Sequence, residues 1–436
     1  MRVLRVSLSR YNPPLRRHRS TVAATPSEIP ILGHSYPTDS YTNITPTIVS
    51  KLSRRLHAQD GHPISTLRSL IENHFPDYAH LSSLSPVVTP YQNFDSLSFP
   101  ADHPGRSKTD SYYINKDVML RTHTSAHEVD VFTSGEARWL LTADVYRRDE
   151  IDASHYPVFH QMEGANIFGT DDASVGAVER DIQRLERQLA ESNIEIQDVQ
   201  HITATNPAQP SHDPRHSEIA ARHLKLSLNS LMYELFAGVG GATKENPLQV
   251  RWIEAYFPFT SPSYEVEVFF RGKWLEILGC GVVLQSTLDR SNVANKMGWA
   301  FGLGLERIAM ILYSIPDIRL FWSEDMRFLS QFTSGKISTF KPYSKYPASY
   351  RDVSFWQPDN GIHDNDVYDL VRDVAGDLAE DVAVIDRFTH PKTKRHSTAF
   401  RVNYRSMDRS LVNEEVNALQ DQVVSRLKEQ LRVEIR

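Results

Sequence analysis

The sequence of 436 residues contains one cysteine, Cys280, which excludes an intrachain disulfide framework and any zinc site built from several cysteines. It contains no run of about 18 consecutive apolar residues, so we expect no membrane-spanning helix and no membrane partner. It lacks a P-loop, and the histidines of 201–223 lack the spacing of metal ligands. With 48 basic and 54 acidic residues, the whole chain also lacks the positive charge of a general nucleic-acid-binding protein.

Acidic residues are missing from the first 27 positions, which contain six arginines. An arginine-rich, serine-containing, acid-free leader without a long apolar core is typical of a mitochondrial transit peptide. We therefore predict a transit peptide over residues 1–27 and a location in the mitochondrial matrix, with a disordered basic tail as the alternative. Without these arginines the chain has 42 basic and 54 acidic residues, a formal net charge of −12.

The spacing of apolar residues predicts a first domain of α+β class over residues 45–325. Within it we treat 165–217 as an insertion without a catalytic role, because its polar, proline-punctuated stretch 203–217 predicts a mobile segment. Helical spacing predicts helices at 62–75, 174–200, 217–236 and 304–314. Alternation of apolar and polar residues predicts antiparallel strands at 139–146, 156–163, 250–257, 264–270 and 273–284.

A second domain is expected over residues 341–436, after a linker at 326–340 that would permit motion. Its pattern reads strand, helix, strand, strand, helix, strand, which is the βαββαβ order of a ferredoxin-like domain. The elements are expected at 350–356, 364–380, 382–389, 396–405, 413–429 and 431–436.

Phe159, Gln161 and Glu163 alternate along a predicted strand and therefore point to one face of it. An aromatic ring, an amide and a carboxylate in one row indicate a ligand platform, with a solvated strand face as the alternative. Arg147 and His155 stand at the two ends of the preceding polar loop, where they can clamp a phosphate. An adenine ring can stack on Phe159.

A glycine-rich strand at 298–304 leads into a helix whose first turn contains Arg307. Both the guanidinium and the positive end of the helix dipole favour an anion at this place. A dinucleotide-binding fingerprint at Gly302 and Gly304 is excluded, because Arg307 stands where the third glycine belongs and no βαβ unit follows.

The loop-bearing hairpin and the Gly-Leu-Glu-Arg helix resemble motifs two and three of the class II aminoacyl-tRNA synthetases. More narrowly, four segments resemble phenylalanyl-tRNA synthetase, and the tail resembles the anticodon-binding domain of its organellar, single-chain form. The four segments are 120–125 (LRTHTS), 146–155 (YRRDEIDASH), 159–164 (FHQMEG) and 256–260 (YFPFT). The resemblance covers roughly 45–165, 218–325 and 341–436.

The resemblance implies a class II antiparallel-sheet catalytic domain that uses ATP and Mg²⁺, with the metal ligands left unassigned. The residues implied in ATP binding are Arg147, Asp149, His155, Phe159 and Arg307, of which Arg147, His155 and Arg307 are implied in catalysis. Those implied in phenylalanine binding are His123, Ser125, Gln161, Glu163, Phe257, Phe259, Thr260 and Ala300.

The implied activity is attachment of L-phenylalanine to tRNA(Phe) through a phenylalanyl-adenylate, for mitochondrial translation and by a monomer. The alternatives are a synthetase-derived RNA-binding protein without catalysis and a class II synthetase for another amino acid. Bacterial relatives often carry a glutamate where Ser261 stands, which argues against an acidic role at this position. An apolar pocket rejects an added hydroxyl only about 10²-fold, and no editing domain is present in the sequence, so we expect measurable tyrosine mischarging.

Charge is unevenly distributed in the second domain. Residues 387–409 contain seven basic residues and one acidic residue, whereas 359–381 contain eight acidic residues and one basic residue. We therefore expect the basic hairpin to meet the tRNA anticodon region and the acidic helix to point away, with a merely solvated surface as the alternative. The residues expected to bind tRNA are Arg387, Lys392, Lys394, Arg395, Arg401 and Arg405.

Overall fold

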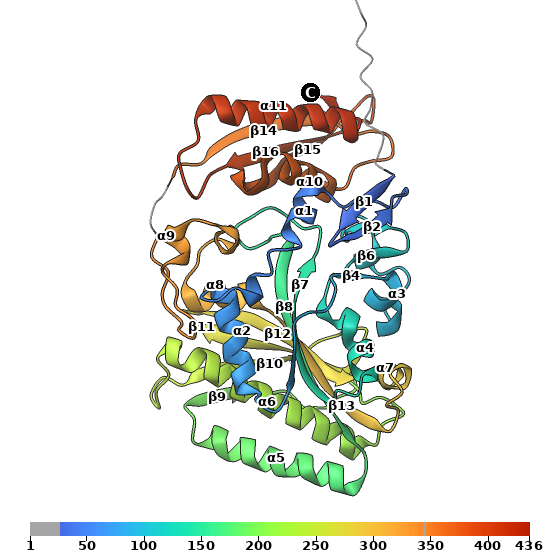
Figure 1. Ribbon diagram of the computed structural model, residues 1–436, viewed down its shortest axis with the longest axis vertical. Helices are drawn as coiled ribbons and strands as arrows, with labels where there is room; N and C mark the ends of the chain where they lie inside the picture. The colour runs from blue at the N-terminus through green and yellow to red at the C-terminus, as the bar shows by residue number, and fades with distance from the viewer. Residues whose placement is uncertain (1–26, 343–345) are drawn as a thin grey trace, which may run out of the picture.

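The computed structural model describes residues 27–342 and 346–436, so the predicted transit peptide lies outside the described part except for Ser27. Within these residues, no helix is long and apolar enough to cross a membrane. The chain forms a large unit around an eight-stranded sheet and a smaller unit that carries the C-terminus (Figure 1).

The eight-stranded sheet is the frame of the larger unit. Its strand pairs are antiparallel except β3–β7 and β10–β9, which are parallel. The expected antiparallel-sheet fold of α+β class is therefore confirmed. In sheet order the strands are β3 (Ala79–Leu81), β7 (Arg138–Tyr146), β8 (Val158–Gly169), β13 (Lys296–Gly304), β12 (Lys273–Val283), β11 (Thr260–Phe270), β10 (Leu248–Glu254) and β9 (Ile194–Gln197).

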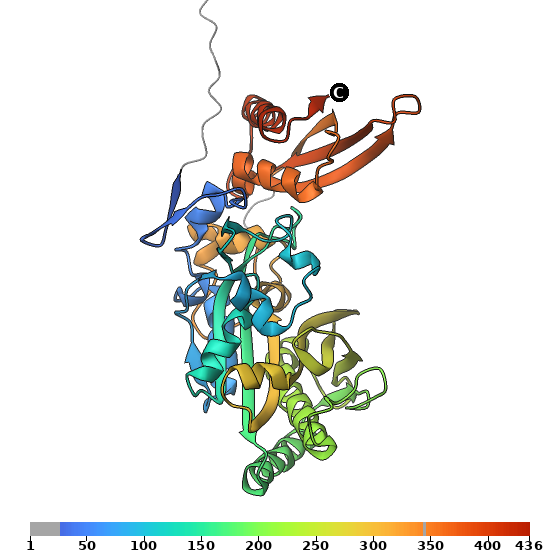
Figure 2. The same cartoon turned by 90° about the vertical axis from the view of Figure 1, so that its right-hand side faces the viewer.

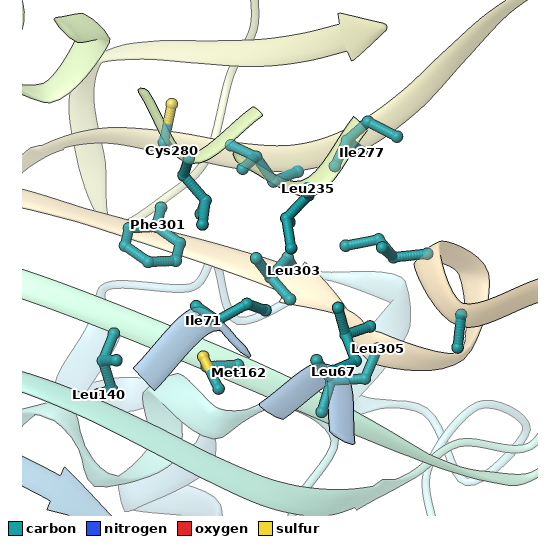
Figure 3. Close-up of a cluster of buried hydrophobic side chains, with 14 of the residues drawn as sticks. Leu67, Ile71, Leu140, Met162, Leu235, Ile277, Cys280, Phe301, Leu303 and Leu305 are labelled. Atoms are coloured by element: carbon teal, nitrogen blue, oxygen red, sulfur yellow. The ribbon is translucent and has the colours of Figure 1, made fainter. Parts of the chain in front are cut away.

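Three helices cover one face of this sheet: α2 (Pro63–His74), α6 (Pro214–Gly240) and α8 (Leu305–Tyr313). Figure 3 shows Leu67 and Ile71 of α2 and Leu235 of α6 meeting Met162 and Leu303 of the sheet. The helices α2 and α8 begin within one residue of their predicted starts, whereas α6 begins three residues before the predicted position 217 and ends four residues after 236. Both α2 and α6 have a proline in the first turn after a capping side chain.

The other face of the sheet is covered only in part, by shorter elements. They are α3 (Pro90–Asn93), α4 (Glu128–Thr133), α7 (Gln285–Arg290) and a small sheet of β4 (Val87–Val88), β6 (Val118–Leu120) and β5 (Tyr113–Asn115). The hairpin of β1 (Glu28–Ile31) and β2 (His34–Pro37) and the helix α1 (Pro46–Lys51) lie near the smaller unit (Figure 1).

The insertion differs from its prediction. Its helix α5 (Asp172–Ala190) ends ten residues before the expected position 200, and the strand β9 follows. The stretch expected to be mobile is packed instead, because the side chains of Asn206 and Gln209 are buried and hydrogen-bonded to the backbone of β11 and β12. Polar composition alone did not indicate that these amides have partners in the sheet.

The smaller unit has the expected ferredoxin-like order, with strands arranged β15-β16-β14-β17 in an antiparallel sheet. Phe400, Val402 and Tyr404 face its core, while Arg401 and Asn403 face outward, as the alternation predicts. Its elements are β14 (Ser349–Trp356), α10 (Asp364–Ala375), β15 (Ala379–Thr389), β16 (His396–Tyr404), α11 (Asn413–Gln430) and β17 (Glu434–Ile435).

The segment 326–340, expected to be a mobile linker, is packed on the larger unit. It contains α9 (Met326–Leu329), and Phe328, Phe332 and Phe340 are buried in the same core as Tyr313. The burial of three aromatic rings is incompatible with a freely moving connection.

The acidic helix α10 faces the larger unit. Asp369 pairs with Arg148 and accepts a hydrogen bond from Tyr112, and Asp366 lies 3.0 Å from Arg148. Asp377, just beyond the helix, lies 3.2 Å from Lys51. Its carboxylates therefore bind cations of the larger unit, and Asp364 at its start pairs with Arg387 of the basic hairpin. The expectation that this helix points away from the tRNA stays a prediction.

Candidate active site

A cavity of about 670 Å³ opens on the partly covered face of the large sheet. Its walls come from β8, β11, β12 and β13, from the segment before β11, and from loops within 94–125. Ten predicted residues line it: His123, Ser125, Arg147, Asp149, Gln161, Glu163, Phe257, Phe259, Thr260 and Ala300.

The floor of the cavity follows from strand register. Glu163 of β8 pairs with Gly302 of β13, which pairs with Gly279 of β12, which pairs with Glu265 of β11. Paired residues point to the same face, so the two carboxylates stand at the ends of a row whose middle has no side chains. A Cβ atom at Gly302 would meet no atom within 4 Å, which shows that this glycine leaves space.

One end of the cavity suits an ammonium group. The Glu163 side chain is 3% exposed, and burial raises its pKa to about 7 against the opposing hydrogen bonds from the Thr124 and Ser125 hydroxyls. The Gln161 Oε1 atom accepts a hydrogen bond from the Thr124 backbone amide at 3.3 Å. A buried carboxylate beside an amide oxygen can bind a cation, because the interaction with the cation compensates for the hydration that the carboxylate loses on burial.

The sequence analysis missed Glu128, which stands near Glu163. It is buried, its Oε2 atom has no hydrogen-bond partner in the described part of the chain, and its pKa is raised by burial and then by the charge of Glu163. Its only signal in the sequence is its place three residues after Ser125, at the start of α4. A second buried acid therefore lies near Glu163, outside the lining of the cavity.

Aromatic rings form the wall beside these acids. The ring centres of Phe257 and Phe259 lie 6.1 Å apart, and Phe259 lies 5.7 Å from Phe99. His123 stacks on Phe99 at 5.5 Å with an angle of 9° between the rings. Burial and the nearby Arg147 lower the pKa of His123 to about 3, so the wall is uncharged at neutral pH. The sequence analysis missed Phe99, which a long loop brings here.

Glycines let the aromatic wall lie close to the strands. A Cβ atom at Gly279 would lie 2.6 Å from the Phe257 ring, and one at Gly281 would lie 2.7 Å from Thr260. Gly281 pairs with Ala300, so small residues end the apolar part of the cavity. The hydroxyls of Thr260 and Ser263 lie 2.7 Å apart and bond to each other.

The other end of the cavity suits phosphate. The Arg147 guanidinium lies 5.2 Å from the centre of the Phe159 ring, and its Nε atom donates to the Thr122 carbonyl at 2.8 Å. Phe159 therefore stands beside the cavity rather than in its lining. Arg307 is largely exposed and lies 3.6 Å from Glu276, a residue of the cavity wall.

The structure does not bring His155 into the cavity. Its Nδ1 atom lies 2.8 Å from Asp152, whose carboxylate also accepts the backbone amides of Ser154 and His155. Burial acts to lower the pKa of His155, but the Asp152 hydrogen bond raises it above its ordinary value. The loop thus closes on itself and places His155 near Arg372, against the smaller unit. His155 lies outside the lining of the described cavity, and its contact with the phosphates stays a prediction.

Glu265 and Glu276 are the residues that fit a magnesium ion. Both line the cavity near Arg307, and the pKa of Glu265 is raised by burial and by the charges of Glu276 and Glu267. Mg²⁺ prefers carboxylate oxygens together with the phosphates of its substrate. A second acidic group, Glu150 with Asp152 and His155, lies on the exposed loop and outside the cavity.

The six residues expected to bind tRNA are not equivalent. Four are paired: Arg387 with Asp364, Arg395 with Glu434, Arg401 with Asp352, and Arg405 with Glu380. Lys392 and Lys394 are exposed at the tip of the β15–β16 hairpin, and Figure 2 shows this hairpin extending away from the body of the molecule. The tip lysines are therefore better placed for a partner than Arg405.

Comparison with known proteins identifies both units. The family described as "tRNA synthetases class II core domain (F)" matches residues 47–207 and 215–332, and "Ferredoxin-fold anticodon binding domain" matches 344–436. The chain is 46% identical to "Phenylalanine--tRNA ligase, mitochondrial" of Saccharomyces cerevisiae, covering 94% of this chain and 95% of the relative. It is 45% identical to the protein of the same name from Mus musculus, covering 91% and 87%. It is 42% identical to "Phenylalanine--tRNA ligase, chloroplastic/mitochondrial" of Arabidopsis thaliana, covering 91% and 83%.

Proposed function

The chain belongs to the phenylalanine–tRNA ligases, which are class II aminoacyl-tRNA synthetases, and from this premise we propose how its cavity works. The enzyme attaches L-phenylalanine to tRNA(Phe) using ATP. The observation that carries the proposal is one buried carboxylate, Glu163, beside an uncharged aromatic wall in the same cavity. That combination fits an amino acid with a cationic amino group and an apolar aromatic side chain.

Phenylalanine is held at both its ends. Its ammonium group lies against Glu163 and Gln161, and its phenyl ring packs against Phe257 and Phe259 with His123 and Phe99 behind. Thr260 and Ala300 close the far end, where the Thr260 hydroxyl is already bonded to Ser263. This placement leaves the carboxylate of the substrate free to point toward the phosphate end.

The reaction has two steps. A carboxylate oxygen of phenylalanine attacks the α-phosphorus of ATP in line, the bond to the β-phosphate oxygen breaks, and pyrophosphate leaves. A hydroxyl of the terminal ribose of tRNA then attacks the carbonyl carbon of the adenylate, and AMP leaves.

The chain supplies position and charge for this chemistry rather than a covalent intermediate. Arg147 meets the α-phosphate and Arg307 meets the γ-phosphate, with Asp149 nearby and adenine against Phe159. When bound at Glu265 and Glu276, Mg²⁺ would neutralise charge on the phosphates.

We further propose that the enzyme acts as a monomer in the mitochondrial matrix. The relatives from Saccharomyces cerevisiae and Mus musculus are named mitochondrial, which supports the compartment, and the acid-free leader supports import. The smaller unit packs on the larger unit of its own chain through Arg148 and Asp369. Light scattering of the full chain tests this state, and a dimer at micromolar concentration would contradict it.

Amino-acid-dependent exchange of pyrophosphate into ATP tests the proposed site. Phenylalanine should support strong exchange, tyrosine weak exchange at saturation, and the other amino acids none, because the pocket rejects an added hydroxyl only about 10²-fold. Arg307→Ala should lower the phenylalanine-dependent rate by about 10²-fold. A folded wild-type protein without phenylalanine-dependent exchange would contradict the proposal and favour the inactive RNA-binding alternative.

A further inference from the structure

The loop that carries Phe259 and Thr260 is held from outside by a side chain of the insertion. The Gln209 Nε2 atom donates to the Ser261 carbonyl and to the Val283 carbonyl, each at 3.0 Å. Its Oε1 atom accepts the backbone amide of Gln285 at 2.7 Å. One buried amide thus ties the start of β11 to the end of β12 and to the start of α7.

A second amide acts two residues further along the same loop. The Asn206 Nδ2 atom donates to the Ser263 carbonyl at 2.8 Å, and its Oδ1 atom accepts the Ser263 backbone amide at 2.8 Å. The Asn206 and Gln209 side chains are only 5% and 9% exposed. The Ser263 carbonyl also accepts the Ala255 backbone amide at 3.1 Å. A buried backbone group that loses a hydrogen-bond partner destabilises the local structure, because water does not replace the bond.

The backbone groups held by Asn206 and Gln209 are one hydrogen bond away from residues that line the pocket. The Ser263 hydroxyl donates to the Thr260 carbonyl at 2.8 Å and bonds the Thr260 hydroxyl, so fixing Ser263 fixes Thr260. The Leu284 amide, next to the Val283 carbonyl that Gln209 holds, donates to the Phe259 carbonyl at 3.2 Å. Neither Asn206 nor Gln209 lines the cavity, so both act through residues that do.

We propose that Asn206 and Gln209 are positioning residues that set the width of the phenylalanine pocket, which makes the insertion part of the amino-acid selectivity of the enzyme. The inference rests on the proposed function of the cavity. Asn206 lies inside the first of the two stretches that match the class II core, 47–207 and 215–332, and Gln209 lies between them. Together their amides support the far end of the pocket from outside.

The test compares Gln209→Ala and Asn206→Ala with Gln200→Ala, an exposed glutamine of the same insertion. In pyrophosphate exchange, the first two variants should raise the KM for phenylalanine about tenfold and leave the KM for ATP within about twofold, because a small displacement of a substrate wall affects one substrate. Their preference for phenylalanine over tyrosine should fall by a similar factor. Gln200→Ala should match the wild type in all three quantities.

A milder variant covers the case in which these proteins do not fold. Ser261→Ala removes only the bond from the Ser261 hydroxyl to the Pro207 carbonyl, 2.8 Å long, and should raise the KM for phenylalanine about threefold. The inference is overturned if folded variants keep the wild-type KM and selectivity, or if the KM values for phenylalanine and ATP rise together. A wild-type protein without phenylalanine-dependent exchange would instead count against the proposed function.

Discussion

At the scale of single residues, Glu163 and Glu128 govern how the cavity responds to pH. Both are buried, and the pKa of each is raised, to about 7 for Glu163. Two interacting acids lose their protons in steps that belong to the pair, and burial favours the protonated form of both. An ammonium group that enters beside them supplies the positive charge that the site lacks.

Phenylalanine should stabilise the protein more at pH 8 than at pH 6. Because the folded pKa of Glu163 lies above its ordinary value of 4.5, its contribution to the stability of the free protein is present below pH 4.5 and is lost as the pH rises through about 7. Bound ammonium favours the ionised carboxylate and offsets this loss. Thermal unfolding with and without phenylalanine measures the shift, and equal shifts at both pH values would contradict the prediction.

Replacing Glu163 by glutamine should weaken phenylalanine binding selectively. The change removes the charge that faces the ammonium group, so the KM for phenylalanine should rise about 10²-fold while the KM for ATP changes by less than about threefold. Glu276→Gln is the matched control at the other end of the cavity, and it should act on ATP instead. A rise of both KM values in Glu163→Gln would argue against the proposed orientation of the substrate.

The residues of the site were predictable where one strand or one short segment carries them. Gln161 and Glu163 follow from alternation along β8, and their shared face is a local property of a strand. Phe99 and Glu128 were not predictable, because a long loop brings Phe99 to the cavity and the packing of α4 brings Glu128 near Glu163. The hydrogen bond between His155 and Asp152, which lies three residues away, was not predictable either.

At the scale of elements, Glu306 joins α8 to β8. Its Oε2 atom accepts the backbone amide of His160 at 2.7 Å, and its Oε1 atom lies 2.6 Å from the His160 ring nitrogen Nδ1. Phe159 and Gln161 flank His160, and Arg307 follows Glu306. One buried carboxylate therefore fixes the phosphate-binding helix relative to the strand that holds the amino acid.

Glu306→Ala should destabilise the fold by about 3 to 5 kcal/mol, because it leaves two buried donors without an acceptor. Glu306→Gln retains one acceptor and should cost about 1 to 2 kcal/mol. Urea unfolding of the two variants measures both values. A loss below about 0.5 kcal/mol for the alanine variant would show that this contact does not hold the elements together.

Among the elements, the regular strands and the helices with proline starts were predictable, whereas the packed irregular segments were not. The stretches 198–213 and 326–340 have polar or mixed composition and no repeating pattern. Their order comes from Gln209, which finds backbone partners in the sheet, and from Phe328 and Phe340, which find a core. Such partners are invisible in a local sequence window.

At the scale of the whole molecule, charge is sorted between two sides of the smaller unit. The carboxylates of Asp366, Asp369 and Asp377 face the larger unit, whereas Lys392 and Lys394 stand at the end of the extended hairpin. No ion pair of the described residues involves these two lysines. The two lysines at the hairpin tip can therefore attract the phosphate groups of an RNA partner.

Lys392→Glu combined with Lys394→Glu should weaken tRNA charging without affecting adenylate formation. The KM for tRNA should rise about tenfold at low salt and depend less steeply on salt, while pyrophosphate exchange stays unchanged. These lysines are a cleaner test than Arg401 and Arg405, whose reversal would also break ion pairs with Asp352 and Glu380.

Lys428→Glu, on the exposed side of α11 in the same domain, is the control for a general change in charge. It should leave tRNA charging close to the wild-type rate. If the control and the double variant weaken charging equally, the hairpin tip has no special part in RNA binding.

The single cysteine has a practical consequence for the whole chain. Cys280 lies between Gly279 and Gly281 of the cavity floor, and its side chain is buried on the opposite, helix-covered face of the sheet, in the cluster of Figure 3. Burial raises the pKa of its thiol, and a thiol reagent can modify it only when this core behind the amino-acid pocket opens. The rate at which the thiol is labelled therefore measures how often this core opens. Bound phenylalanine should slow the labelling. The unaltered protein suits this measurement because Cys280 is its single cysteine.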